Sequence, residues 1–182
     1  MDVRRDRTSG WLPRFVIVMI RFLHSADWQL GARFAQFGAQ GARLREARLE
    51  TLDRTLAQAR ERGADAFLVA GDLFEDNQVD ESLVRSVVDR FRASAPLPIY
   101  LLPGNHDPDT GPDSVWERPA FRSAPSHVQV LCRAGIHELA PGAVLLASPL
   151  HQKRSTHDPS LKLAELSSGL GADVIKIGMT HG

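Results

Sequence analysis

The feature that most constrains the fold of this chain is an alternation of short apolar segments with amphipathic helical segments. The apolar segments are 15–23, "DAFLVAGD" and "LPIYLLPGNHD". Between them, apolar residues recur at helical spacing over 42–62 and again after Asp80, which is placed to cap the second helix. Strands that alternate with helices in this way are typical of an α/β domain.

Apolar side chains mark one face of each of these two predicted helices. The first helix ends at Gly63, because glycine commonly stops a helix. The apolar faces comprise Leu49, Leu52, Leu56 and Ala59 in the first helix and Leu83, Val84, Val87, Val88 and Phe91 in the second. Both faces predict burial against a sheet.

The second half of the chain predicts shorter elements. Three strands are expected within 127–148, in "HVQVL", "GIHEL" and "AVLLAS". Asp158 is placed to cap a helix that has Pro159 at its first position and reaches Leu170. A last strand follows in "DVIKIGMTHG". Since no repeat or linker divides this part of the chain, 19–182 is predicted to be one domain.

The first 18 residues are predicted to be a leader outside this domain. Met19 offers an alternative start, "MIRFLHSAD", so the leader is open to being a misassigned beginning. The apolar run 15–20 is six residues long before Arg21 interrupts it. That is far below the roughly 20 residues of a membrane span, and no small-residue cleavage site follows. We therefore expect no membrane association.

Composition and charge bound the possible partners and the compartment. Lys plus Arg and Asp plus Glu both total 22, so the net charge is zero and no general basic footprint for nucleic acid exists. A local basic groove remains compatible with that balance. The single cysteine, Cys132, excludes an intrachain disulfide and fits a reducing cytoplasm.

Polar residues gather where four of the predicted strands end. Asp27 follows the first strand, Asp72 the second, 105–107 ("NHD") the third, and His181 the last. In α/β sheets, ligands bind beyond the carboxyl ends of the strands. Oxygen ligands with imidazole fit Mn²⁺, Mg²⁺, Fe or Zn²⁺. Each aspartate alone is more typical of a turn or helix cap, but together they favour a metal site.

The stretches "FLHSADWQLG", "FLVAGDLFEDN", "IYLLPGNHDP" and "IGMTHG" resemble the motifs of calcineurin-like metallophosphoesterases. Within that superfamily the chain resembles the SbcD-type DNA repair exonucleases, since "HSADW" favours the nuclease branch over protein phosphatases. The resemblance spans 20–182. It implies a β-sandwich flanked by helices, with a two-metal site at the strand ends.

The resemblance also implies a role for each matching residue. Asp27 would bind the first metal and Asp72 would bridge both metals. Asn105 and His181 would hold the second metal. His106 would stand over the scissile phosphate, where it stabilises charge or protonates the leaving group. Two metals can activate water and clamp the attacking and leaving oxygens of an in-line displacement.

Two positions leave alternatives open. Glu75 stands where related enzymes have an acidic residue or a histidine, so its carboxylate would keep His106 oriented and protonated; a solvated loop acid is the alternative. Gln29 stands where the family usually has histidine. Its neutral amide oxygen predicts a weaker first metal site, less suited to zinc. Alternatively, Gln29 hydrogen-bonds a metal-bound water.

The resemblance implies a further Gly-His-x-His loop that supplies one histidine to each metal. No such motif follows "HG" at 181–182, and the other histidines lack that context: His127, His137, His151 and His157. We therefore interpret the chain as a fragment, with a fold incomplete at the C-terminus.

The function implied by the resemblance is metal-dependent phosphodiester hydrolysis, as a DNA exonuclease or endonuclease in repair. The resemblance also implies Mn²⁺, homodimerisation and an SMC-like ATPase partner. One alternative is a phosphoesterase acting on a nucleotide or another small phosphate ester. Another is a non-catalytic binding domain with a degraded metal site. Arginines on the first helix fit either DNA phosphates or a solvated face: Arg43, Arg45, Arg48, Arg54, Arg60 and Arg62.

Overall fold

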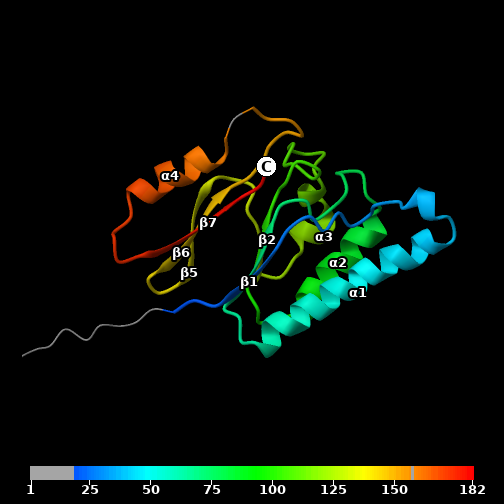
Figure 1. Ribbon diagram of the computed structural model, residues 1–182, viewed down its shortest axis with the longest axis horizontal. Coiled ribbons are helices and arrows are strands. Elements are labelled where there is room, and N and C mark those ends of the chain that lie inside the picture. The colour runs from blue at the N-terminus through cyan, green and yellow to red at the C-terminus, as the bar shows by residue number, and fades with distance from the viewer. Residues whose placement is uncertain (1–18, 157) are drawn as a thin grey trace, which may run out of the picture.

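The computed structural model describes residues 19–156 and 158–182, and these form two β-sheets with helices on their outer faces (Figure 1). The strands are β1 (Phe22–Ser25), β2 (Ala66–Ala70), β3 (Ile99–Leu102), β4 (Val128–Val130), β5 (Gly135–Ala140), β6 (Ala143–Ser148) and β7 (Ile175–Thr180). The α-helices are α1 (Gln40–Glu61), α2 (Glu81–Ala93), α3 (Pro119–Arg122) and α4 (Ser160–Ser168). Two short 3₁₀ turns, Ala35–Phe37 and Val115–Glu117, complete the elements.

The first sheet is parallel and has the strand order β1-β2-β3-β4. Its central strands are buried on both faces, because side chains alternate between two apolar layers. Phe67 and Ile99 belong to the cluster that includes the buried faces of α1 and α2. Leu68 and Leu102 point the other way, into a cluster shared with Leu145 of the second sheet. The two sheets therefore form a sandwich.

The second sheet has the order β5-β6-β7, with β5 antiparallel and β7 parallel to β6. Helix α4 packs on β6 and β7, and a Cβ added to Gly178 of β7 would lie 3.1 Å from Leu163 of α4. Figure 1 shows α4 beside the second sheet and α1–α3 beside the first. The predicted α/β fold, a β-sandwich flanked by helices, is confirmed.

Of the buried first strand predicted over 15–23, only 22–23 lie in an observed strand. Residues 15–18 lie outside the described residues, and 19–21 are not in a strand. Strand β1 begins at Phe22, whose exposed fraction is 39%. The reason is that β1 lies at the edge of the first sheet, where β2 is its one partner among the residues that the structure describes.

The ends of two helices also differ from the prediction. Asp80 precedes α2, but its side chain makes no capping hydrogen bond, and its carbonyl oxygen accepts from Val84 N at 3.2 Å. Pro159 is the residue before α4 rather than its first helical residue, and Asp158 Oδ1 accepts from Ser160 N at 2.8 Å. Both aspartates lie where a helix begins, as predicted, although only the Asp158 side chain accepts a hydrogen bond from a backbone amide.

The leader predicted over 1–18 lies outside the described residues. Among the helices in the described part of the chain, none combines the length and apolar character needed to cross a bilayer.

Candidate metal centre

The candidate site lies beyond the carboxyl ends of β1, β2, β3 and β7. The segment after β1 continues alongside the segment after β2, so the parallel pairing extends past both strands. Asp27 N donates to Gly71 O at 3.2 Å, and Gln29 N donates to Asp72 O at 2.9 Å. These backbone hydrogen bonds fix the two segments that carry the predicted carboxylate ligands.

Left-handed backbone conformations concentrate in these two segments. In the described part of the chain, four non-glycine residues have a positive φ, and three of them are predicted ligands: Asp27 (55°), Gln29 (44°) and Asp72 (55°). This conformation costs roughly 1–2 kcal/mol per residue, although aspartate tolerates it better than most. Strain of this kind persists where the surrounding structure enforces it, which is common at functional sites.

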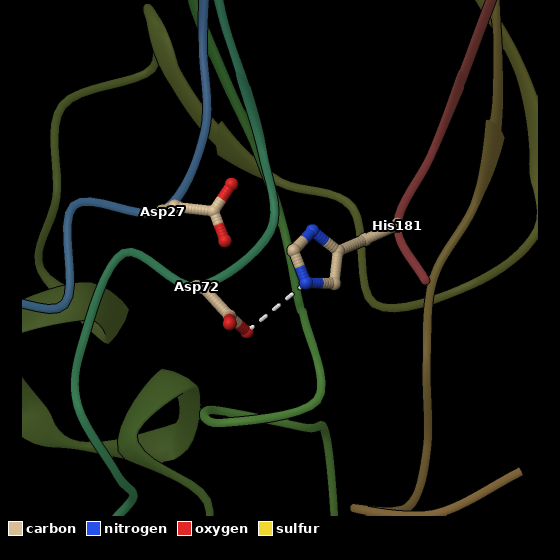
Figure 2. A group of neighbouring side chains, drawn as sticks. All are labelled: Asp27, Asp72 and His181. Carbon is tan, nitrogen blue, oxygen red and sulfur yellow. Dashed lines mark ion pairs between the residues drawn. The ribbon is translucent and has the colours of Figure 1, made fainter.

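Asp72 and His181 form the centre of the site (Figure 2). Asp72 is 2% exposed, and its Oδ1 lies 3.4 Å from His181 Nε2. The same Nε2 lies 3.0 Å from Asn105 Oδ1, while His181 Nδ1 lies 2.8 Å from Ala70 O. Each of these partner atoms is a hydrogen-bond acceptor, so a protonated ring, which donates from both nitrogens, satisfies all of them.

The charges of this pair shift both pKa values. The hydrogen bond to Asp72 is the main reason why the pKa of His181 rises to about 9, against the opposing effect of burial. Burial is the largest influence on Asp72 and raises its pKa, but the bonds from His181 and from His106 N together bring it below its usual value. Without metal, the stability contributed by His181 is fully present below pH 6.5 and is lost as pH rises through about 9. The stability contributed by Asp72 is present above pH 3.8 and is lost as pH falls through its lowered pKa.

The residues present fit a divalent cation. One ligand atom from each of Asp27, Asp72 and His181 lies within 4.8 Å of the others, and Figure 2 shows these side chains pointing toward one another. Asn105 adds an amide oxygen beside His181 Nε2. His181 also directs its other N–H to the Ala70 carbonyl, which is how metal-binding histidines are commonly oriented. Carboxylate, amide and imidazole donors suit a hard or borderline ion such as Mn²⁺.

Gln29 lies next to this group but contacts it through its backbone. Its N–H binds Asp72 O, and its carbonyl accepts from Arg48 Nη1 at 2.8 Å. Within 19–156 and 158–182, its side-chain amide makes no hydrogen bond. The structure therefore brings four predicted ligands together, namely Asp27, Asp72, Asn105 and His181. Gln29 lies beside them, and its side-chain amide is not held by any other described residue.

Two glycines leave room for the central pair. A Cβ on Gly71, where φ is 86°, would lie 2.3 Å from the His181 ring. A Cβ on Gly104 would lie 2.1 Å from Asp72 Oδ1. Gly104 does not have a positive φ, so close approach alone requires glycine there, whereas Gly71 is required by both conformation and space.

His106 lies at the rim of the site with its ring fixed at one nitrogen. Its backbone N–H donates to Asp72 Oδ1 at 2.9 Å. Its Nδ1 lies 2.9 Å from the backbone carbonyl of Glu75, and because a carbonyl only accepts, Nδ1 carries the proton. Glu75 therefore orients His106 through its backbone carbonyl, whereas the prediction used its carboxylate. In the described residues the Glu75 carboxylate itself makes no hydrogen bond or ion pair.

Asp107 is a supporting residue that the sequence placed in the polar cluster without a role. It is fully buried, and its carboxylate accepts from Phe74 N at 2.9 Å and from Gly104 N at 2.8 Å. Burial is the main cause that raises its pKa to about 6. Asp107 therefore ties the loop after β3 to the loop after β2. Its position as the last residue of "GNHD" was the only signal.

Arg48 has a different role from either one considered for the arginines of the first helix. Its Nη1 donates to Trp28 O at 2.7 Å and to Gln29 O at 2.8 Å, and its guanidinium lies 4.8 Å from the centre of the Phe34 ring. Arg48 therefore holds the loop that carries Asp27 through its Nη1.

Carboxylate, amide and imidazole donors at the strand ends of an α/β fold are suited to a metal-dependent enzyme. The family model of calcineurin-like phosphoesterases matches residues 20–160, and the chain belongs to that family. The matched region contains Asp27, Asp72, Asn105 and His106, and it ends before His181. The match supports a phosphoester hydrolase, with the group at Asp27, Asp72 and His181 as its candidate metal site.

Proposed function

We propose that this chain is a metal-dependent nuclease of the SbcD-type branch that hydrolyses phosphodiester bonds in DNA with two divalent ions, most suitably Mn²⁺. The observation that carries the proposal is the convergence of Asp72, Asn105 and His181 around one ring nitrogen, beside Asp27. Family membership supplies the phosphoester chemistry. The choice of DNA rests on the resemblance of "HSADW" to the nuclease branch.

The residues that would hold the ions are Asp27, Asp72, Asn105 and His181, with Gln29 available at the rim. Bound divalent ions polarise phosphoryl oxygens and activate water for in-line attack. Asp72 is suited to contact two ions, because it has two carboxylate oxygens and lies between the loop of Asp27 and the ring of His181.

His106 is the residue proposed to act on the substrate. Since Glu75 O holds its Nδ1–H, the reactive position is Nε2, which has no hydrogen-bond partner in the part of the chain that the structure describes. In the protonated ring, Nε2–H would donate to a phosphoryl oxygen or deliver a proton to the leaving oxygen. The backbone bond from His106 N to Asp72 fixes the distance between this ring and the metal ligands.

Several finer proposals rest on the resemblance alone. They are a role in DNA repair, a cytoplasmic location, homodimerisation and an SMC-like ATPase partner. Each is separable from the chemistry of the site, so none is needed for the activity test.

The test is hydrolysis of linear duplex DNA, single-stranded DNA and bis(para-nitrophenyl) phosphate with Mn²⁺. We expect DNA to be degraded, with loss of activity in His106→Asn. His127→Asn is the matched control, because His127 Nε2 lies 3.1 Å from Phe91 O, outside the site. Cleavage of the small diester with intact DNA would instead favour a small-molecule phosphoesterase. Binding of Mn²⁺ with no hydrolysis would favour a non-catalytic binding domain.

A further inference from the structure

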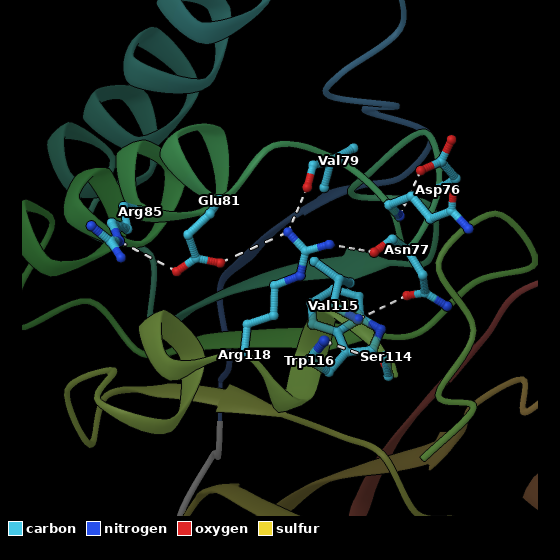
Figure 3. Close-up of polar contacts among 10 residues, drawn as sticks. Asp76, Asn77, Val79, Glu81, Arg85, Ser114, Val115, Trp116 and Arg118 are labelled. Carbon is cyan, nitrogen blue, oxygen red and sulfur yellow. Dashed lines mark hydrogen bonds and ion pairs between the residues drawn. The ribbon is translucent and has the colours of Figure 1, made fainter. Parts of the chain in front are cut away.

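A second hydrogen-bond network connects the loop after β2 with the segment after β3, around Asn77 and Arg118 (Figure 3). Asn77 follows β2 in the chain, and Arg118 lies between the second 3₁₀ turn and α3. Arg118 donates from Nη1 to Val79 O and from Nη2 to Asn77 O. Both bonds attach the main chain of the loop after β2 to the segment that follows β3.

The Asn77 side chain makes the reciprocal connection. Its Nδ2 donates to Pro108 O at 3.0 Å, and its Oδ1 accepts from Val115 N at 2.9 Å. The amide is therefore satisfied on both atoms by backbone groups of the segment after His106. Since both partners are main-chain atoms, the connection depends on Asn77 and not on the side chains it contacts.

These bonds close a small ring that contains the His106–Glu75 contact. Glu75 is two residues before Asn77, and His106 is two residues before Pro108. One side of the ring is the bond from His106 Nδ1 to Glu75 O, and the opposite side is the bond from Asn77 Nδ2 to Pro108 O. Movement of either loop therefore changes the distance between Nδ1 and its acceptor.

The Arg118 guanidinium is fixed by contacts on two sides, so it can hold the loop that contains Asn77 and Val79. Its side chain is 21% exposed, and Nη1 also lies 3.8 Å from Glu81 Oε2. Glu81 is the first residue of α2, so the guanidinium connects the loop to a helix of the core. A planar group with fixed donors suits two separate carbonyls better than a lysine ammonium does.

We propose that Asn77 and Arg118 are positioning residues for His106: they hold the Glu75 carbonyl at the distance that keeps the proton on Nδ1 and leaves Nε2 for the substrate. The inference rests on the proposed phosphoester hydrolysis for its catalytic consequence. The orientation of the ring is a property of the protein alone, so it is measurable without activity.

The first measurement is the tautomer of His106 in isotope-labelled protein, from long-range proton–nitrogen correlation spectra. The signal is assigned by its absence in His106→Gln. We expect wild type to show the Nδ1–H form and Asn77→Ala and Arg118→Met to show a mixture of tautomers. Arg122→Met is the matched control, because the exposed Arg122 side chain pairs, among the described residues, with the Glu117 carboxylate alone.

The second measurement is hydrolysis of bis(para-nitrophenyl) phosphate. We expect kcat to fall about 10- to 100-fold in Asn77→Ala, with KM little changed, since a misplaced catalytic group costs about that much. Arg118→Lys should recover part of the rate and Arg118→Met should not. Thermal unfolding is followed for every variant, so that rates are compared where each one is folded.

The outcomes separate this inference from the proposed function. A wild type without hydrolase activity but with the tautomer change in Asn77→Ala would overturn the proposed function and leave the positioning role supported. An unchanged tautomer in both variants would overturn the inference, whatever the activity. So would equal losses of rate in Asn77→Ala and Arg122→Met.

Discussion

Asp27 and Asp72 follow neighbouring parallel strands in the same left-handed conformation, yet their surroundings differ. Asp72 is buried and bonded to His106 N and His181, whereas Asp27 is exposed, and its carboxylate accepts no hydrogen bond from the described residues. The strand order explains the contrast, because β2 lies between β1 and β3 while β1 lies at the edge. A residue at the end of β2 is enclosed by the loops of both neighbours. The sheet thus encloses one carboxylate and leaves the other open to water.

Replacement of the enclosed carboxylate should have the largest effect. We expect Asp72→Asn to weaken Mn²⁺ binding by about 100-fold or more, because a charge pair at an effective dielectric of 20 is worth roughly 4 kcal/mol at 4 Å. Calorimetric titration measures the loss. Asp89→Asn, on the exposed side of α2, is the control and should bind as wild type does. Equal affinity in Asp72→Asn would remove Asp72 from the metal site.

Crowding the His181 ring should be nearly as damaging. Gly71→Ala places a methyl group 2.3 Å from that ring at a φ of 86°, so we expect about 10- to 100-fold weaker Mn²⁺ binding. Gly111→Ala is the matched control, because φ there is 84° and an added Cβ would meet no described atom within 4 Å. The control should lose about 1–2 kcal/mol of unfolding free energy with unchanged affinity. If both variants bind Mn²⁺ equally, the close approach of Gly71 to His181 has no role in the site.

Protons should compete with the metal at His181. The hydrogen bond to Asp72 raises the pKa of His181 to about 9, so the ring is protonated at neutral pH and must lose that proton to bind an ion. We expect the apparent Mn²⁺ affinity to rise about tenfold per pH unit from 7 to 8 and to level near pH 9. Titrations in buffers of different ionisation enthalpy should show about one proton released at pH 7. An affinity independent of pH over this range would exclude His181 as a ligand.

The fold followed from sequence patterns because both faces of a parallel sheet are apolar and helices show periodic faces. Four candidate ligands could be placed together from sequence, since the carboxyl ends of parallel strands share one edge. Strand β1 was misplaced because an apolar run looks the same whether or not a neighbour pairs with it. The roles of Arg48, Asn77 and Asp107 were not predictable, since each one binds main-chain atoms of a distant segment. Backbone donors and acceptors leave no mark in a sequence.

The exposed carboxylate should matter less than the enclosed one. We expect Asp27→Asn to weaken Mn²⁺ binding by about five- to tenfold, because a charge pair at 4 Å in a water-like dielectric is worth only about 1 kcal/mol. The loss should shrink as salt is added, since exposed charges are screened. Salt should leave the defect of Asp72→Asn almost unchanged. A larger loss in Asp27→Asn than in Asp72→Asn would reverse the comparison between the two carboxylates.

The smallest change should come from Gln29→His, and it should strengthen the open side of the site. Histidine tolerates the φ of 44° at this position better than most residues, and the backbone bonds to Asp72 and Arg48 do not depend on the side chain. An imidazole is a more basic ligand than an amide oxygen, so Mn²⁺ affinity should rise about fivefold, less than the roughly 10- to 100-fold effects of supporting residues. Zn²⁺ should gain more than Mn²⁺, because it prefers nitrogen ligands. Gln58→His, on the exposed face of α1, controls for metal binding by a surface histidine. Unchanged Mn²⁺ and Zn²⁺ affinities by calorimetry would show that position 29 does not reach the metal, and the open side would then consist of Asp27 alone.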